Sequence, residues 1–502
     1  MEYDAKTRES FDFYCFLNNI LMLVLGVAPY STGDKTSFAF VSARDRWPII
    51  ITGAIDDVHR AVGEITDPAK HADGKRIIEK LATLKYEVQH DRQLTPLEDD
   101  GESDVEDYNK ELAARGNPTW FDVSWLYSEC YLYRRINTFF TLSTYWKSYD
   151  VFSAQKISTF RSSRPAVLEL AARYKELSEQ LTHEASSEHD KAAEELLFDE
   201  MCEICLWGNA TDLSLLTSLT YDDIQKLQGS QARKDSEKNI LVNDLPAAYH
   251  VLKSLQKSNP STSDTDLDAR RVDIILDNAG FELYVDLILA GFLLASNLAT
   301  SVVLHPKSMP WFVSDVLPGD FSALLNALAD PQTFYSSPSS STTGTATPPG
   351  TKTPPLTPAE TSSLQFLFQQ WSTYHSTGRL LIRPNRFWTT AHTYWRLPHL
   401  SPSLHKDLQS SVLVIFKGDL NYRKLVCDAD WDVSVPFNQG CGPLGEKGSG
   451  IRVLALRTCK ADTVVGLPRG RDEELRGGKK EREWSWSGKW AVVQFWDGKE
   501  EA

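Results

Sequence analysis

The stretch that decides the fold is Val272-Asp-Ile-Ile-Leu-Asp-Asn-Ala-Gly-Phe-Glu282, an apolar run that ends in Asp277-Asn278 and is followed by Gly280. Such a run predicts a buried strand, a tight turn and then a helix. A carboxylate and an amide at the carboxyl end of a strand are well placed to hold a hard cation and a phosphate. Asp and Asn in this position more often only cap the next helix, so the interpretation needs support from elsewhere in the chain.

Three later segments repeat this pattern of an apolar run followed by polar residues. Residues 302–304 lead toward Asp315, residues 412–416 lead into Lys417-Gly-Asp-Leu-Asn-Tyr422, and residues 453–456 lead into Arg457-Thr-Cys-Lys460. The carboxyl ends of parallel strands lie at one edge of a sheet. We therefore expect these four strand ends to converge on one site.

The composition indicates a globular protein that acts on small molecules. The chain has 502 residues, of which 41% are apolar, so it can bury a large core in two lobes or one elaborated domain. The formal net charge of −15 argues against a nucleic-acid partner, because phosphate backbones are bound by clustered Lys and Arg. The apolar residues 15–28 are too few to span a bilayer, so we expect no membrane partner either.

The cysteines argue for a reducing compartment. There are seven of them, spread from Cys15 to Cys459, and they form no compact disulfide framework. We expect a cytoplasmic location, with the nucleus as the alternative. Cys202-Glu-Ile-Cys205 has the spacing of a redox or metal site, but no second cysteine or histidine pair completes such a site. Two buried thiols on a helix are the preferred interpretation.

Hydrophobic periodicity divides the chain into a helical part and an α/β part. Residues 1–27 form an N-terminal extension, and residues 28–205 form a mainly helical region. In residues 206–500, short β-rich runs alternate with helical runs, which predicts a parallel sheet covered on both faces. The alternating run at 484–496 is expected to form a strand at the edge of that sheet.

A Ser/Thr/Pro/Gly-rich stretch from Tyr335 to Ser363 interrupts the α/β part. It has almost no charged or large apolar side chains, so it cannot offset the entropy lost on ordering, and we predict a disordered insert at 335–363. The stretch lies between Asp315 and Lys417, whose segments are expected to build one site. We therefore interpret it as a surface insertion within the domain.

The residue types at the predicted strand ends suit a cation and a phosphate. Asp277, the Asn278 carbonyl and Asp315 supply three oxygen donors for a divalent ion and leave positions open for phosphate and water. Lys417 and Lys460 would neutralise phosphate oxygens. Either lysine alone would be interpreted as a solvated side chain at a turn, so the prediction depends on the four ends meeting.

Several motifs in chain order resemble the metal-dependent damage-control phosphatases, and more narrowly their third subfamily, the sugar-phosphate phosphatases, which carry an RTxK element near the C-terminus. The resemblance runs from about residue 28 nearly to the end of the chain, whereas residues 1–27 and the Ser/Thr/Pro insert lie outside it. Its motifs are Arg-Asp-Arg-Trp-Pro (44–48), Glu-Cys-Tyr-Leu-Tyr-Arg-Arg-Ile (129–136), Leu-Trp-Gly-Asn-Ala-Thr-Asp-Leu-Ser (206–214), Asp-Asn-Ala-Gly-Phe-Glu (277–282), Trp-Phe-Val-Ser-Asp (311–315), Lys-Gly-Asp-Leu-Asn-Tyr-Arg (417–423) and Arg-Thr-Cys-Lys (457–460).

This resemblance implies a three-layer α/β/α sandwich with a mainly parallel sheet, preceded by a helical N-terminal region. It implies hydrolysis of phosphomonoesters such as fructose 1-phosphate and fructose 6-phosphate, with Mn, Co, Ni or Mg as the divalent metal. The metal ligands would be Asp277, Asn278 and Asp315. The sugar-phosphate substrate would contact Asp419, Leu420, Asn421, Tyr422, Arg423 and Lys460, with Arg44 as a further candidate.

As a mechanistic hypothesis, a metal-polarised water attacks phosphorus in line while Lys417, Lys460 and backbone amides neutralise the phosphate oxygens. A second role for Asp277, as a nucleophile, stays open. Two alternative functions remain: an adenosylmethionine-dependent carboxyl methyltransferase acting on protein glutamate, and a non-catalytic sugar-phosphate-binding module. The first lacks a clear glycine-rich turn for its cofactor, and the second would not need three oxygen ligands.

Overall fold

The structure, a computed structural model, describes residues 26–183, 188–208, 238–258, 267–336 and 354–500. Its centre is a seven-stranded sheet in the order β1-β7-β6-β5-β2-β3-β4. All neighbours are parallel except β6 and β7, which confirms the predicted mainly parallel sheet. The strands are β1 (Ile240–Asn243), β2 (Arg271–Ile275), β3 (Ser301–His305), β4 (Leu380–Ile382), β5 (Leu413–Lys417), β6 (Arg452–Thr458) and β7 (Ala491–Asp497).

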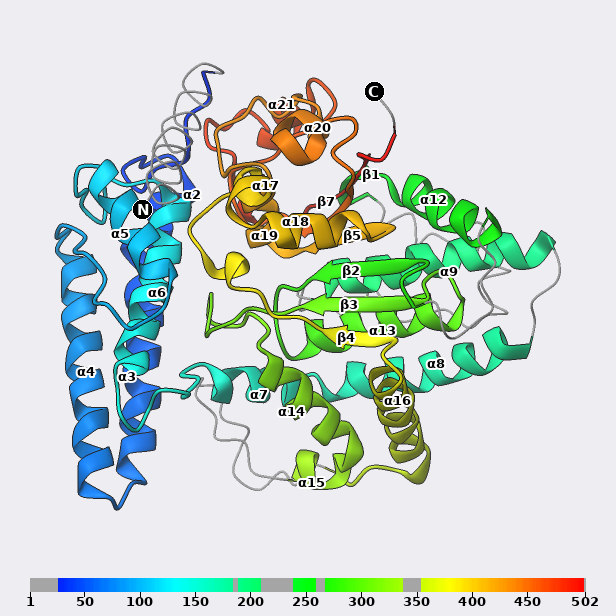
Figure 1. Ribbon diagram of the computed structural model, residues 1–502, viewed down its shortest axis with the longest axis horizontal. Helices are drawn as coiled ribbons and strands as arrows, with labels where there is room; N and C mark the ends of the chain where they lie inside the picture. Colours follow the sequence, from blue (N-terminus) through cyan, green and yellow to red (C-terminus); the bar gives the residue numbers. More distant parts are fainter. Residues whose placement is uncertain (1–25, 184–187, 209–237, 259–266, 337–353, 501–502) are drawn as a thin grey trace, which may run out of the picture.

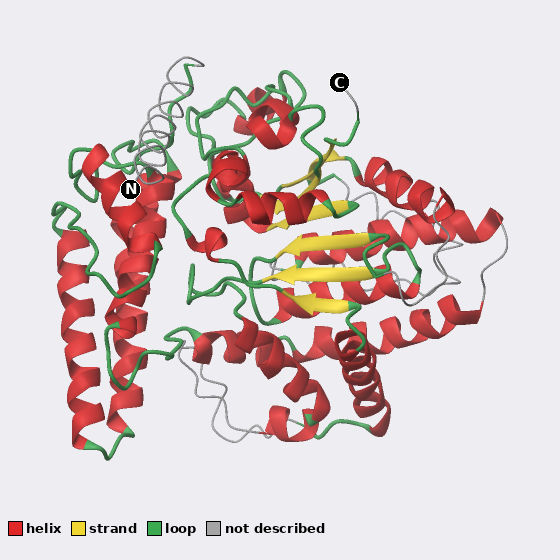
Figure 2. Cartoon of the chain, in the orientation of Figure 1, coloured by secondary structure: helices red, strands yellow, loops and turns green. Residues whose placement is uncertain are grey.

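Helices cover both faces of the sheet (Figures 1 and 2). Side chains alternate between faces along a strand, so Ile274 packs in one core and Ile275 in the other. One layer contains α8 (Arg164–His183), α9 (Glu188–Trp207), α12 (Leu245–Ser258), α13 (Phe281–Ala295), α14 (Pro318–Ala329), α15 (Pro331–Ser336) and α16 (Pro358–Ser376). The other contains α17 (Leu397–Leu400), α18 (Pro402–Gln409), α19 (Gly418–Leu425) and α20 (Phe437–Gly440). The short helix α21 (Arg471–Arg476) lies in the connection between β6 and β7.

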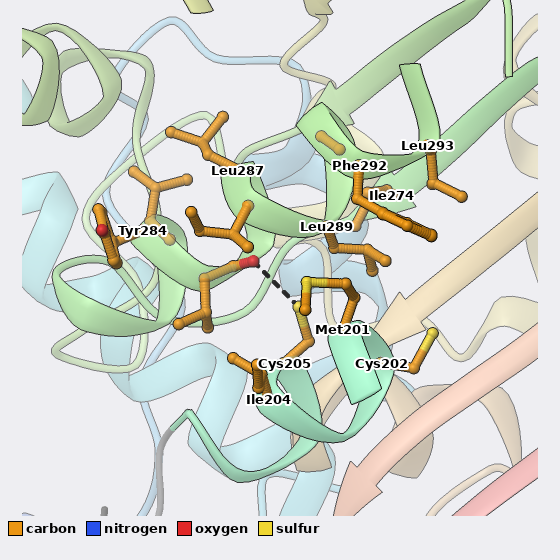
Figure 3. Close-up of a cluster of buried hydrophobic side chains, with 14 of the residues drawn as sticks. Met201, Cys202, Ile204, Cys205, Ile274, Tyr284, Leu287, Leu289, Phe292 and Leu293 are labelled. Carbon is orange, nitrogen blue, oxygen red and sulfur yellow. Dashed lines mark hydrogen bonds between the residues drawn. The ribbon is translucent and has the colours of Figure 1, made fainter. Parts of the chain in front are cut away.

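The α9–α13 contact explains the closely spaced cysteines (Figure 3). Cys202 and Cys205 are buried, and the Cys205 thiol donates a hydrogen bond of 3.1 Å to the Val285 carbonyl. Burial raises the pKa of both thiols well above its usual value, which disfavours the reactive thiolate. The prediction of buried thiols on a helix is confirmed.

The N-terminal helices form a separate cluster against the carboxyl ends of the central strands (Figure 1). Met309, Trp311, Leu420 and Ala461, which follow β3, β5 and β6, pack in the core of this cluster. The helices therefore form a wall at the edge where the polar strand ends lie. They are α2 (Phe38–Val41), a π-helical turn (Ser42–Arg46), α3 (Trp47–Gly63), α4 (Pro68–Gln89), α5 (Asp104–Ala114) and α6 (Trp125–Thr141), with α7 (Ser153–Ser162) leading toward the sheet.

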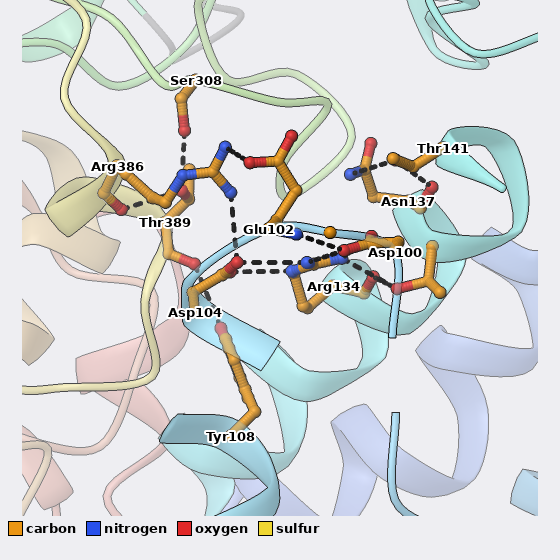
Figure 4. Close-up of polar contacts among 12 residues, drawn as sticks. Asp100, Glu102, Asp104, Tyr108, Arg134, Asn137, Thr141, Ser308, Arg386 and Thr389 are labelled. Carbon is orange, nitrogen blue, oxygen red and sulfur yellow. Dashed lines mark hydrogen bonds and ion pairs between the residues drawn. The ribbon is translucent and has the colours of Figure 1, made fainter. Parts of the chain in front are cut away.

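A buried ionic network joins this wall to the sheet domain (Figure 4). Arg134 on α6 lies 2.8 Å from Asp100 and 2.7 Å from Asp104. Asp104 also binds Arg386, 3.1 Å away, at the start of the segment 386–396. The Tyr108 hydroxyl adds a hydrogen bond of 3.1 Å to a carbonyl of the same segment. One carboxylate is thus shared by two arginines from the two parts of the molecule.

Three expectations about chain organisation need correction. The strand at the C-terminal end, β7, lies between β1 and β6, so β1 occupies the sheet edge. The predicted insert 335–363 is too wide, because α15 extends to Ser336 and a capping box of Thr357 and Glu360 begins α16. Within this predicted insert, residues 337–353 lie outside the described residues. The predicted boundary at 205/206 does not separate two cores, since α8 and α9 pack on the sheet. Of the extension 1–27, only residues 26 and 27 are described.

Within the described ranges, no helix is both long enough and apolar enough to cross a bilayer.

The segment 386–396 buries a histidine whose titration should appear in the stability of the fold. Nδ1 of His392 lies 3.6 Å from Glu111 and 3.1 Å from Arg396. Burial lowers the pKa of His392 to about 4, against the opposing pull of Glu111 and with help from Arg396, Lys424 and Arg115.

Because an unfolded imidazole titrates near 6.5, the unfolded state binds more protons between about pH 6.5 and pH 4, and the free energy of unfolding should fall by about 3 kcal/mol as pH falls through this window. Denaturant titrations at several pH values should show this slope reduced in His392→Gln and retained in the exposed His90→Gln control. An unchanged slope in His392→Gln would contradict the assignment.

Candidate active site

The structure brings the four predicted strand ends together. Backbone hydrogen bonding pairs Asn278, after β2, with Asp315, in the loop after β3. Gly418, after β5, lies directly against the Asp277 side chain. Asp419 accepts a hydrogen bond of 2.9 Å from the main chain of Lys460, after β6. The predicted convergence at one edge of the sheet is confirmed.

Asn278 is held by hydrogen bonds at both ends of its amide. Its Nδ2 donates to Asp277 Oδ2 at 2.7 Å and to Glu282 Oε2 at 2.8 Å. Its Oδ1 accepts a hydrogen bond from the Ser314 hydroxyl. Main-chain bonds of 2.6 Å from Ala279 to Ser314 and 2.9 Å from Val316 to Asp277 lock the two loops together. The amide orientation is therefore fixed by its neighbours.

Asp277 and Asp315 are buried acids with too little positive charge around them. Burial raises the pKa of Asp277 well above its usual value, and the nearby carboxylates of Glu282 and Asp315 raise it further. Burial also raises the pKa of Asp315 to about 6, although Lys307 opposes this shift. Lys307 Nζ lies 3.2 Å from Asp315 Oδ2, but among the described residues this oxygen accepts no hydrogen bond. The site therefore has an excess of negative charge.

This arrangement suits a hard cation only if the amide takes part. No group of three or more His, Cys, Asp or Glu side chains within the described ranges is arranged to hold a metal ion. Two carboxylates, from Asp277 and Asp315, and the Asn278 carbonyl form the candidate set. The orphaned Asp315 oxygen and the mutual repulsion of the acids both match the presence of a divalent ion bound through oxygen ligands.

The loop that carries Asp315 is strained. Phe312 and Val313 have φ angles of 45° and 68°, in the left-handed region that side chains, and branched ones above all, rarely adopt. Such strain, of roughly 1–3 kcal/mol per residue, persists only where surrounding contacts impose it. Here the Phe312 ring stacks on Tyr133 of α6, with ring centres 4.7 Å apart. A helix of the N-terminal wall thus supports the shape of the candidate site.

Lys417 is placed differently from the expectation that it faces phosphate. Its buried ammonium group lies 2.9 Å from Asp286 and 3.2 Å from Glu282, and it donates a hydrogen bond of 3.0 Å to the Cys205 carbonyl. Burial would lower the pKa of Lys417, but the carboxylates of Asp286 and Glu282 outweigh it and raise the pKa. Lys417 therefore balances the charges of Asp286 and Glu282, and its contact with a phosphate stays a prediction.

Asp419 and Lys460 lie together at the turn after β6, and their contact with a substrate stays a prediction. Asp419 accepts a hydrogen bond of 2.8 Å from Arg457 as well as the bond from the Lys460 main chain, so it fixes the turn after β6. Lys460 is half-buried, and its positive charge lowers the pKa of Asp277 against the larger effect of burial. Among the described residues, no carboxylate forms an ion pair with Lys460.

The rest of α19 makes internal contacts. Leu420 packs in the N-terminal helical core. The Asn421 amide donates to the carbonyls that end β2 and β5 and accepts a hydrogen bond of 2.6 Å from Tyr394. The Tyr422 hydroxyl binds Gln494, and Arg423 pairs with Glu129 of α6 at 2.7 Å. These side chains hold the site's walls together, and their direct contact with a substrate stays a prediction.

Arg44 lies on the surface, where it pairs with Asp45 at 2.6 Å and has half of its side chain exposed. Its substrate contact also stays a prediction. The neighbouring Arg46 instead lines a cavity of about 800 Å³ between α3, α6 and residues 312–314. Sequence reasoning did not single out Arg46, Tyr133, Glu282 or Lys307, although the first three lie inside the quoted motifs and Lys307 follows a strand end.

Gly418 offers a direct test of the geometry. Its φ is +80°, and a Cβ atom there would come within 1.9 Å of Asp277 Oδ2. Gly418→Ala should therefore destabilise the fold by about 1–3 kcal/mol and displace Asp277. Chemical denaturation measures the loss. Gly101→Ala, with a φ of +83° and open space around its Cβ, is the matched control, and equal stability of the two variants would contradict the close approach.

Comparison with known proteins identifies the family of the chain. The profile of the family described as Damage-control phosphatase ARMT1-like domain matches residues 42–475. Damage-control phosphatase ARMT1 of Xenopus laevis is 36% identical over 477 residues, covering 93% of this chain and 98% of that protein. The Homo sapiens protein of the same name is 32% identical over 480 residues, covering 93% and 98%.

A solved structure of a DUF89 family protein from Pyrococcus horikoshii aligns with 85% of this chain and 93% of that chain, at 12% identity and a TM-score of 0.32, a likeness too remote to support an argument. The family assignment rests on the profile, which spans most of the chain, and on the full-length relatives. The chain belongs to the damage-control phosphatase family, with an ARMT1-like domain.

Proposed function

We propose that this protein is a metal-dependent phosphatase that hydrolyses phosphomonoesters of sugars, such as fructose 1-phosphate and fructose 6-phosphate. The observation that carries the proposal is the buried pair Asp277 and Asp315, held with the Asn278 amide at the sheet edge beside Lys460. A buried excess of negative charge is costly unless a cation compensates it. Membership of a phosphatase family agrees with a phosphate ester as the second component.

Asp277, Asn278 and Asp315 would hold the divalent ion, with Mn, Co, Ni or Mg as candidates. When bound, such an ion polarises a phosphoryl oxygen and favours ionisation of a nearby water. Lys460, which has no carboxylate partner among the described residues, would neutralise phosphate oxygens. Water supplies the oxygen that forms the new bond to phosphorus, the ester P–O bond breaks, and the sugar hydroxyl and phosphate leave.

The remaining polar residues orient this set. Glu282 accepts a hydrogen bond from the Asn278 amide nitrogen, so the Asn278 carbonyl oxygen is directed away from Glu282 toward Ser314, and it would bind the ion with its second lone pair. Lys417 balances the charges of Glu282 and Asp286, so these acids add less repulsion to Asp277. Arg457 and Asp419 fix the turn that presents Lys460. We assign Lys417 a positioning role in this scheme.

The test is phosphate release from a panel of sugar phosphates with Mn²⁺, with and without a chelator. Asp277→Asn should lower turnover at least about 100-fold, because it removes a charged ligand from the proposed site. Its thermal stability should equal or exceed that of the wild type, because the substitution relieves repulsion with Asp315.

The exposed Asp45→Asn is the control and should keep full activity. Chelator-insensitive hydrolysis, or wild-type turnover by Asp277→Asn, would refute the proposal. Binding of adenosylmethionine in a parallel calorimetric titration, without phosphate release, would instead support methyl transfer.

A further inference from the structure

The cavity beside the candidate site is larger than one sugar ring requires. At about 800 Å³ it lies in the size range of sites that enclose drug-sized ligands. Ser314, which binds Asn278, lies in its wall, so the cavity adjoins the site. Its lining does not include Asp277, Asp315 or Lys460. The space therefore extends away from the place where a phosphate ester would be cleaved.

Arg46 contributes a positive charge to the wall of this cavity. It ends the π-helical turn Ser42–Arg46, a form of helix that is rare and often found at functional sites. Its guanidinium donates one weak hydrogen bond of 3.3 Å to Ser42 and lies 5.2 Å from the Phe38 ring. Within the part of the chain that the structure describes, no carboxylate pairs with it. The lining also carries three carboxylates: Asp57 pairs with Arg60, Glu129 pairs with Arg423, and Asp56 is exposed.

Tyr133 lines the cavity together with Arg46 and contacts the loop that leads to Asp315. Its ring stacks on Phe312 of the strained loop and lines the cavity. Burial raises the pKa of the Tyr133 phenol, Glu129 raises it further, and Arg46 lowers it, while the carboxylate of Asp315 also acts on it. Arg46 and Asp315 are therefore both close enough to Tyr133 to influence its charge.

We infer that the cavity binds the part of the substrate remote from the scissile phosphate, and that Arg46 selects substrates with a second anionic group there. A guanidinium binds phosphate or carboxylate through paired hydrogen bonds, and an unpaired one facing a cavity suits such a group. The preferred substrates are then sugar bisphosphates or phosphorylated sugar acids. This inference rests on the proposed function and narrows it to a substrate class.

Two matched substrate pairs test the inference, each differing by one anionic group: fructose 1,6-bisphosphate with fructose 1-phosphate, and 6-phosphogluconate with glucose 6-phosphate. The wild type should show a kcat/KM at least about tenfold higher for the member with two anionic groups in at least one pair, since a charge-assisted hydrogen-bonded pair contributes roughly 1.5–3 kcal/mol. The pair that shows the preference identifies the second group as phosphate or carboxylate.

Arg46→Gln should abolish this preference by raising KM for the member with two anionic groups. It should leave kcat/KM for the member with one anionic group within about twofold of the wild-type value. Arg76→Gln, which changes an exposed arginine of α4 that pairs with Asp73, should leave both members unchanged. Tyr133→Phe keeps the stacked ring and serves as a second variant. For the substrate with two anionic groups, its KM should rise less than that of Arg46→Gln.

Two results would overturn the inference and leave the phosphatase proposal intact. One is a wild type that does not favour the substrates with two anionic groups, and the other is an Arg46→Gln enzyme that loses activity equally on both members of a pair. Absence of hydrolysis of all four compounds with Mn²⁺ would instead count against the proposed function. A calorimetric titration then tests Arg46 without turnover. It compares the binding of fructose 1,6-bisphosphate to Asp277→Asn and to the double variant Asp277→Asn/Arg46→Gln. A lower affinity in the double variant supports the inference, and equal affinity overturns it.

Discussion

The simultaneous burial of Asp277 and Asp315 is the constraint on which the rest of the site depends. Burial raises the pKa of both carboxyl groups, and Asp315 raises that of Asp277 further, so the fold tolerates them only because neighbouring groups hold them in place. Lys307 approaches Asp315 from one side, and the Asn278 amide binds Asp277 from the other. The remaining negative charge gives this edge of the sheet its affinity for a cation in the function we propose.

The N-terminal helices complete this site and also enclose it. Arg423 of α19 lies 3.6 Å from the Trp125 ring and pairs with Glu129, both on α6. The shared carboxylate of Asp104 makes a second connection, between α6 and the segment 386–396 (Figure 4). Breaking such buried pairs typically costs about 3–5 kcal/mol. The helical wall is therefore strongly coupled to the strand ends, and it can impose the left-handed conformation of Phe312 and Val313 through the contact with Tyr133.

The strands and their convergence could be predicted from the sequence because each central strand is a short, fully buried apolar run that stops at a polar residue. The directions of individual side chains could not. Lys417 turns toward Asp286, and Arg423 turns toward Glu129, nearly 300 positions away, so their roles depend on tertiary partners that no local pattern contains. For the same reason, the prediction that β7 lies at the sheet edge was wrong, because no local pattern shows that β1 pairs with β7.

Arg44 and Arg46 show a further limit of reasoning from motifs. The two arginines stand in the same short motif and both are exposed, but only Arg46 lines the cavity. A motif alone therefore suggested Arg44, whereas the backbone brings Arg46 to the cavity wall. The difference matters because one guanidinium pairs with Asp45 on the surface and the other faces the space next to the site.

The most direct measurement of the proposed cation site is a calorimetric titration of the metal-free protein with Mn²⁺, carried out in parallel on Asp315→Asn. Our account predicts one Mn²⁺ bound per chain in the wild type and binding at least about 100-fold weaker in the variant, because two carboxylates and one amide oxygen are the whole proposed ligand set. Equal affinity in the two proteins, or no binding to the wild type, would contradict it.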